Sequence, residues 1–523
     1  MCRRELPFEL LAETTATTGR SVLRGGFWYT ASRVVPQLYT LAISIVAARF
    51  LGPGGMGRQS FIAFVELSLV AVLSNGMFFA LMRWVGESVG RRTSAGLEGV
   101  LRWAWGATGL LALGGSGVLV GASLLGAEPS SAWLLAAAVC FTATLHAVPS
   151  AVLVGLQQWR RAAVVGLVTG LVGTGVVIVV LAAGGGITGM FAVEAGVSVV
   201  NLAWTGRLAR QALVTEAETD GGTVAADLRR AVARAALVLT ASEVLSLIVE
   251  RRSEVFFLVH YSGDVQIALY SIVFSVVSAL LQLPYAMAAA LGPAVATLFG
   301  ASSFERIRSG YARATRLLII AMMPLTALGL SVGPALLRLV YGGEYRGTRP
   351  ILLVMMAAFP VTAASAAANA LLTGLGRLRA LLMASALAAA VDVGLAAALV
   401  PSHAAVGAAV ANVGAQAVLA IVLLASVRRA IGPTRWEAGA LVRAAIAATA
   451  AGLAAWAAVY LLGDRAGVPV GLVVALLAFS FVALRLRILA ADDAVWLDAT
   501  VGPYLGGAVG WFCRAALSGG RRP

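Results

Sequence analysis

Long apolar segments recur along almost the whole sequence and leave few folds open to it. A helix needs about 18–20 apolar residues to cross a hydrocarbon layer of about 30 Å. Because 60% of the residues are hydrophobic and only 12% are charged, most segments between turns reach this length. We therefore predict an all-α polytopic membrane protein with about 14 transmembrane helices, at residues 26–49, 59–82, 101–126, 131–156, 162–183, 187–206, 234–259, 265–299, 316–340, 350–373, 380–400, 404–427, 441–463 and 467–490.

The arginines indicate how these helices are oriented. All 39 basic residues are arginine, and none is lysine. If the N-terminus lies inside, thirty arginines fall in cytoplasmic segments and six fall in outside loops. Positively charged short loops stay on the cytoplasmic side of a membrane. The sequence therefore predicts that both termini are cytoplasmic.

The residue types present exclude several classes of function. Without lysine, the chain cannot form a Walker A loop or a pyridoxal Schiff base. The three cysteines and three histidines are too scattered for a disulfide framework or a metal site, and no cofactor is implied. A net charge of +15 on so apolar a chain favours anionic membrane lipid, and not nucleic acid, as its partner.

An internal repeat divides the chain into two parallel six-helix lobes, helices 1–6 and 7–12, with two extra C-terminal helices. Residues 51–60 match 262–271, and 155–160 match 374–379, at a spacing near 211–219 residues. Six crossings per unit place the two lobes in the same orientation, as parallel repeats have. The expected domains are a cytoplasmic segment at 1–25, the N-lobe at 26–208, a linker at 209–233, the C-lobe at 234–430, helices 13–14 at 431–490 and a cytoplasmic tail at 491–523.

Three features of the sequence together resemble those of a known transporter family. They are the turn Leu51-Gly52-Pro53 that ends at Gly57, the Gly-Leu-x-x-x-Arg turns at 155–160 and 374–379, and the 6+6+2 helix count. Over about residues 25–490 they resemble the polysaccharide-transport branch of the multidrug/oligosaccharidyl-lipid/polysaccharide (MOP) exporter superfamily. One departure is Arg58-Gln59, where that family commonly has an apolar residue followed by tyrosine; the second copy keeps Leu269-Tyr270.

The resemblance implies a flippase and not an enzyme. Members of that branch move undecaprenyl-pyrophosphate-linked oligosaccharides, which are surface polysaccharide precursors, across the bacterial cytoplasmic membrane by alternating access. Their helices 1, 2, 7 and 8 line a central cavity between the lobes. The partners implied are a polyprenyl-pyrophosphate-linked sugar, membrane lipid, and H⁺ or Na⁺ as coupling ion.

Charged residues inside the predicted helices are the candidate site residues, because an ionised side chain at mid-membrane costs about 2.5–3.5 kcal/mol. Guanidinium groups bind phosphate oxygens in two-point contacts, so Arg33, Arg251 and Arg252 are candidates for the pyrophosphate site. The alternative is that Arg251 and Arg252 only neutralise neighbouring acids. Candidates for coupling or for lining the cavity are the four acids Glu66, Glu243, Glu250 and Glu254.

Three further polar residues lie on helices farther from the expected cavity. Asp392, Glu194 and Asn412 are expected to hydrogen-bond between helices, as polar side chains within membranes commonly do. In helix 7, by contrast, Glu243, Glu250 and Glu254 follow at i, i+7 and i+11 on one stripe, which must face protein or water.

Other functions stay open. A cation-coupled multidrug antiporter of the same superfamily uses acids in its lobes, although such proteins usually have twelve helices and an arginine in helix 1 would repel a cationic drug. A lipid II flippase is a close relative of the first interpretation. A polysaccharide polymerase or glycosyltransferase would need a sizeable outside loop, and the longest here, near 339–349, has only about a dozen residues.

Overall fold

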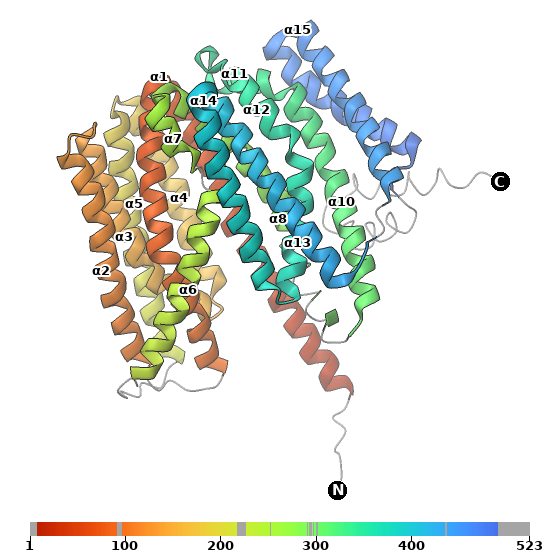
Figure 1. Ribbon diagram of the computed structural model, residues 1–523. Helices are drawn as coiled ribbons and strands as arrows, with labels where there is room; N and C mark the ends of the chain where they lie inside the picture. Colours follow the sequence, from red (N-terminus) through yellow and green to blue (C-terminus); the bar gives the residue numbers. More distant parts are fainter. Residues whose placement is uncertain are drawn as a thin grey trace. The chain divides into compact units, whose positions relative to one another are not determined.

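The computed structural model describes residues 8–90, 97–216, 226–250, 253–289, 302–434 and 437–489, with isolated positions between 291 and 299. Side chains are described from residue 35 onward, except at a few positions that include Glu243 and residues 245–250. Throughout these ranges the chain is helical and contains no strand (Figure 1). The prediction of an all-α membrane protein is confirmed.

The helices follow the predicted apolar segments. The first group is α1 (Phe8–Gly90), α2 (Leu97–Leu124), α3 (Ser130–Gly155), α4 (Trp159–Ala182), α5 (Gly186–Glu216) and α6 (Ala226–Glu250). The second group is α7 (Glu254–Tyr261), α8 (Asp264–Ala289), α10 (Phe304–Ser331), α11 (Gly333–Tyr341), the short 3₁₀ helix η1 (Gly343–Tyr345), α12 (Thr348–Ala357), α13 (Phe359–Gly374), α14 (Leu378–Ile431) and α15 (Ala438–Leu486).

Three of these helices are pairs of predicted helices joined at a sharp break. α1 breaks at Gly52 (φ 67°, ψ 177°) and α15 at Gly463 (φ 70°, ψ 175°). Glycine reaches this backbone region without the steric penalty that a Cβ brings. α14 breaks at Ala404, where a non-glycine residue holds φ 45° and ψ −129°. Each long helix therefore supplies two of the expected crossings.

Nine helices of the described chain are long and apolar enough to cross a membrane, and ten if the bent pair α12–α13 counts as one span. Pro360, which the sequence places within a single predicted helix, lies at the start of α13, and the two helices meet at 45°. Proline at the first helical position lacks an N–H that the helix does not need there. The expected helix at 234–259 is likewise described as two helices, α6 and α7.

The chain forms two compact units. Unit 1 comprises residues 1–51 and 59–247, and unit 2 comprises Gly52–Arg58 and residues 248–523. α6 thus groups with the first unit, and its Val232 and Ala236 lie in a buried cluster with Met77 and Val85 of α1. A side chain at Gly76 would collide with the backbone of α6, so these two helices pack closely. The domain boundaries drawn from the sequence stay a prediction.

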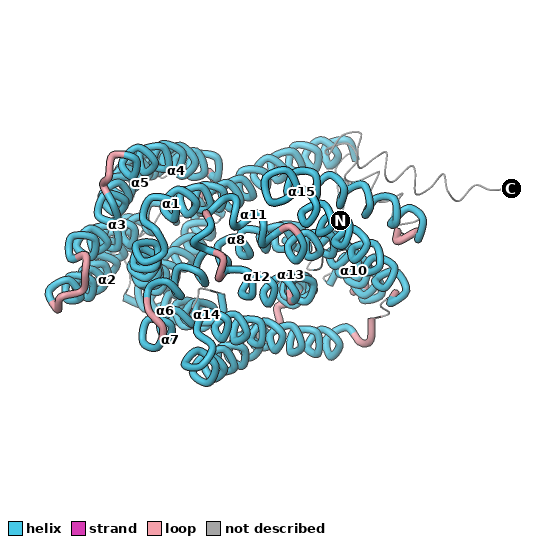
Figure 2. The backbone as a smooth tube through the Cα atoms, turned by 90° about the horizontal axis from the view of Figure 1, so that it is seen from above, coloured by secondary structure: helices cyan, strands magenta, loops and turns pink. Residues whose placement is uncertain are grey.

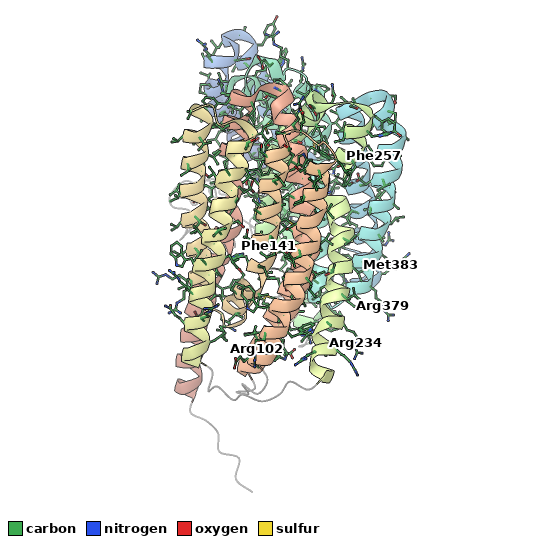
Figure 3. All side chains as sticks on the ribbon, turned by 90° about the vertical axis from the view of Figure 1, so that its left-hand side faces the viewer. Arg102, Phe141, Arg234, Phe257, Arg379 and Met383 are labelled. Atoms are coloured by element: carbon green, nitrogen blue, oxygen red, sulfur yellow. The ribbon has the colours of Figure 1, made fainter. Side chains whose placement is uncertain are left out.

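Within unit 1, α2, α3 and α5 lie side by side (Figure 2). Polar side chains join α3 to α5 along their length, at Thr142–Ser198 (2.7 Å between hydroxyl oxygens) and at His146–Thr205 (3.1 Å from Nε2 to Oγ1). Such hydrogen bonds stabilise contacts between helices in a membrane, where the hydrophobic effect does not drive helix association. Arg102 and Arg234 lie at one end of the unit-1 helices, away from Phe141 (Figure 3).

Within unit 2, α15 packs along α10 and is tied to its surroundings by two ion pairs. Arg316 of α10 binds Glu437, just before α15 begins. Arg338 of α11 donates from both Nε (2.9 Å) and Nη2 (2.8 Å) to the carboxylate of Asp464, beside the break in α15. α15 is therefore held by ion pairs at its start and at its central break.

Candidate functional site

Most of the predicted site residues lie outside the described side chains. Arg251 and Arg252 are not described, and neither are the side chains of Arg33, Glu243 and Glu250. The pyrophosphate site therefore stays a prediction. Glu66 and Glu254 are described, and each is buried.

Glu254 is the first residue of α7 and lies at the centre of a buried polar cluster in unit 2. Its side chain is 0% exposed and faces the carboxyl of Asp392 and the amide of Asn412. Neither carboxylate oxygen of Glu254 receives a hydrogen bond of regular geometry from the described residues. Asp392 is also 0% exposed, and Asn412 is 5% exposed. The site thus brings together two carboxyls and an amide from three helical segments.

Ser253 completes this cluster. Its hydroxyl donates to Asp392 Oδ2 at 2.6 Å and does not cap the N-terminus of α7. A serine at a helix start usually accepts from a backbone N–H of the first turn. Here the side chain instead ties α7 to α14.

The break in α14 places the other two members of the cluster. Asp392 lies before the turn at Ala404, and Asn412 lies after it. Where the two halves of α14 pack together, a side chain at Gly407 would meet the backbone of Leu399. The missing side chain at Gly407 therefore allows both polar residues to reach the same α7.

With both carboxyls ionised, this cluster is electrostatically unfavourable. Two negative charges about 4 Å apart repel by about 4 kcal/mol at an effective dielectric constant of 20, and burial away from water adds to the cost. No arginine or histidine contacts Glu254 or Asp392 among the described residues. The pair therefore needs a proton or a bound cation to be stable. Oxygen atoms of carboxylate, amide and hydroxyl groups are the ligands that hard cations take.

The described residues contain no group of three or more histidine, cysteine or acidic side chains that could hold a metal ion. The unit-2 cluster supplies only two carboxylates. Each ionised carboxylate offsets one positive charge, so the pair with one shared proton matches a monovalent ion better than a divalent one.

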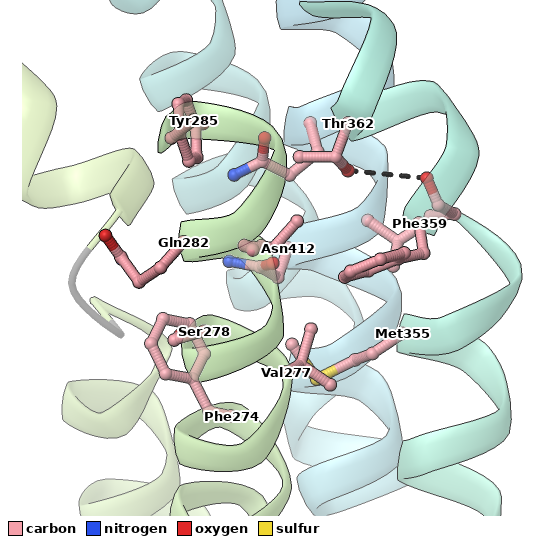
Figure 4. A pocket seen from close by; sticks show the side chains of 13 residues that line it. Phe274, Val277, Ser278, Gln282, Tyr285, Met355, Phe359, Thr362 and Asn412 are labelled. Carbon is pink, nitrogen blue, oxygen red and sulfur yellow. Dashed lines mark hydrogen bonds between the residues drawn. The ribbon is translucent and has the colours of Figure 1, made fainter. Parts of the chain in front are cut away.

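A cavity lies beside the cluster. It has a volume of about 120 Å³ and is enclosed by α8, α12, α13 and the second half of α14 (Figure 4). Asn412 belongs both to the wall of this cavity and to the surroundings of Glu254. Asn412 therefore connects the acid cluster with the cavity wall.

The second described candidate, Glu66, is buried in unit 1. Its side chain is 1% exposed, and its Oε2 has no hydrogen-bond partner among the described residues. Glu194 of α5 acts on it electrostatically, and Cys140 of α3 lies nearby. Unit 1 thus has a buried acid of its own.

Arg58, which departs from the family pattern, has a partner in the other copy of the repeat. Its Nε donates to Asp264 Oδ2 at 2.8 Å. Asp264 is the first residue of α8, and a side chain at Gly57 would collide with its backbone. The two repeat-related turns therefore contact each other within unit 2.

Comparison with known proteins places this arrangement in context. The MatE family model matches residues 252–397, a segment that contains Glu254 and Asp392. No curated protein matches. Among solved structures, the inward closed conformation of the lipid II flippase MurJ is similar over 90% of this chain and 98% of its own, with a TM-score of 0.67 and 12% identity.

Other transporters of the MOP superfamily are similar as well, and one of them is described as a multidrug resistance transporter. An inward-facing MATE family transporter of the MOP superfamily matches 77% of this chain and 98% of its own, with a TM-score of 0.63 and 17% identity. A MOP superfamily transporter from Pyrococcus furiosus matches 79% of this chain and 95% of its own, with a TM-score of 0.51 and 16% identity. The chain has the fold of MOP superfamily transporters, and its residues 252–397 match the MatE family model.

Proposed function

We propose that this chain, which has the MOP transporter fold, is a flippase that moves an undecaprenyl-pyrophosphate-linked oligosaccharide across the bacterial cytoplasmic membrane. Alternating access carries the headgroup, and the polyprenyl tail stays in lipid. Moving a pyrophosphate and many hydroxyl groups through hydrocarbon costs on the order of tens of kcal/mol, because these charged and polar groups lose their hydration. A passage lined by arginine replaces the water that these groups lose.

The observation that carries the flippase proposal is α15. This helix pair, Ala438–Leu486, lies outside the duplicated lobes and is anchored to unit 2 by the Arg338–Asp464 and Arg316–Glu437 ion pairs. Similarity to the lipid II flippase covers 90% of the chain, whereas similarity to the MATE transporter covers 77%. The presence of the additional helix pair α15 in this chain would explain why the match to the MATE transporter covers a smaller share of it.

Three arginines are proposed for the pyrophosphate, namely Arg33, Arg251 and Arg252. Glu254 and Asp392 are proposed to bind the coupling ion, because they form a buried pair that a proton or Na⁺ stabilises. Glu66 is proposed as a second acid of the transport cycle, and Glu243 and Glu250 as acids that line the passage. Both termini are proposed to be cytoplasmic.

The test is transport by purified protein in vesicles that contain a fluorescent polyprenyl-pyrophosphate sugar. We expect Arg33→Ala and Arg251→Ala to slow flipping at unchanged expression. Glu254→Gln and Asp392→Asn are expected to make flipping independent of the cation gradient. Glu98→Gln, an exposed acid near the start of α2, is the matched control. Undiminished flipping in both arginine variants removes the proposed headgroup site.

The MatE match favours one competing function, a cation-coupled multidrug antiporter, because it covers the segment with both acids of unit 2. Expression in a pump-deficient host distinguishes the two: drug resistance supports the antiporter. The likeness to MurJ favours a second competitor, a lipid II flippase. Complementation of a strain that lacks its own lipid II flippase tests it.

A further inference from the structure

The cavity in unit 2 is uncharged, is lined by both apolar and polar side chains, and is large enough for water. Thirteen residues line it, and none of them is charged. Its volume of about 120 Å³ corresponds to about four water molecules at about 30 Å³ each. The groups available to hydrogen-bond this water come from Ser278, Gln282, Tyr285, Asn412 and Gln416. A site that is both polar and roomy holds water, whereas an apolar one of this size stays dry.

Two polar atoms of the cavity wall are buried without a hydrogen bond of regular geometry to the described residues, although the Asn412 amide lies against the carboxyl of Glu254. These atoms are Asn412 Nδ2 and Gln416 Oε1. Buried polar groups in native proteins almost always have a partner, which is either protein or ordered water. One is a donor and the other an acceptor, and they lie one helical turn apart on α14. Both side chains line the cavity, so water there could hydrogen-bond to Gln416 Oε1.

The same wall meets the acids. Asn412 faces Glu254 on one side and lines the cavity on the other. Asn412, on the second half of α14, therefore connects the water-sized space with the buried carboxyl pair. The titratable groups at this point are the carboxyls of Glu254 and Asp392, and Tyr285 is the titratable group of the cavity wall.

We infer that this cavity is a hydrated vestibule through which a monovalent cation reaches the Glu254–Asp392 pair, and that Asn412 passes the ion from water to carboxylate. Neutral oxygen and amide groups replace the ion's hydration shell step by step, as they do in ion pathways. The negative pair behind Asn412 favours cations over anions in the vestibule. The inference rests on the proposed role of Glu254 and Asp392 in coupling, and it adds the route and the residues of entry.

Radiolytic hydroxyl-radical footprinting of the full-length protein in nanodiscs tests the vestibule without any transport. Two adjacent methionines provide a matched pair. Met355 lines the cavity and is 5% exposed, whereas Met356 does not line it and is 0% exposed. Radicals formed in bound water oxidise Met355, so we expect it to react at least about tenfold faster than Met356. Equal rates overturn the vestibule.

Gln416→Leu tests conduction, because Gln416 lines the cavity but does not face Glu254. The apolar side chain removes one acceptor, so we expect Met355 oxidation to fall towards that of Met356. We also expect the half-saturating cation level for transport to rise about tenfold, which corresponds to about 1.4 kcal/mol. Titrations with Na⁺ at fixed pH and with H⁺ at fixed Na⁺ identify the ion. Gln211→Leu on α5 is the control.

The outcomes separate the vestibule from the proposed coupling. If Glu254→Gln abolishes cation dependence but the two methionines oxidise equally, the coupling acids stand and the vestibule is overturned. If Met355 oxidises rapidly but Gln416→Leu leaves cation dependence unchanged, conduction through the vestibule is overturned. Should Gln416→Leu fail to fold, Gln416→Ala and Ser278→Ala provide the same readouts.

Discussion

Neutralising one carboxyl of the Glu254–Asp392 pair should stabilise the protein. Both side chains are 0% exposed, and they face each other without a cationic partner among the described residues. The repulsion of two full charges in contact is about 4 kcal/mol at an effective dielectric constant of 20. A proton shared for part of the time removes roughly half of this repulsion. We therefore expect Asp392→Asn to raise the free energy of unfolding by about 2 kcal/mol, or roughly 2 °C in Tm for a chain of 523 residues.

Thermal unfolding followed by intrinsic fluorescence measures this effect, with and without the coupling cation. The wild type should gain about 2.7 kcal/mol when Na⁺ or H⁺ reaches 100 times its Kd, and Asp392→Asn should lose most of that gain. Asp264→Asn is the control, because Asp264 is an exposed acid that pairs with Arg58. The reasoning is wrong if Asp392→Asn unfolds at a lower temperature and keeps the full cation response.

Other predictions concern the anchoring of α15 and the turn of α1. A double-mutant cycle of Arg338→Ala and Asp464→Ala should give a coupling energy of about 1 kcal/mol, since the pair is bidentate but about a third exposed; a value near zero in thermal unfolding contradicts it. Gly57→Ala should destabilise the protein by about 1–3 kcal/mol, because the added methyl group collides with the backbone of Asp264. Gly54→Ala, which meets nothing within 4 Å, should be neutral or slightly stabilising in the same assay.

The fold was largely predictable because membrane solvation imposes a length on every crossing segment. The apolar stretches at 26–49 and 59–82 became the two halves of α1, and the glycine between them marks the break. Interruptions within a predicted helix were harder to place. The bend before Pro360 depends on how α12 and α13 pack, and hydropathy is the same on both sides of it.

The site was predictable in part. Glu254 is detectable because an acid in an apolar segment is costly to bury. Its partners follow 138 and 158 residues later, at Asp392 and Asn412, and apolar periodicity does not reveal which helices touch. One signal pointed to Asp392: it is the only aspartate, glutamate or arginine between residues 380 and 427. The expected hydrogen bond between helices is present at Ser253–Asp392, but the sequence does not indicate that Glu254 lies beside it.

The duplicated lobes share a scaffold but not a charge pattern. At a spacing of 218 residues, which lies within that of the repeat, Gly189 aligns with Gly407 and Glu194 aligns with Asn412. An acid in unit 1 therefore stands where unit 2 has the amide that faces Glu254. Since a ligand shifts a conformational equilibrium only through its different affinity for the two states, a cation held by the unit-2 cluster acts on α7 and α14 first. Function in this fold therefore follows from the residues that each lobe places at equivalent positions, and not from the scaffold that the lobes share.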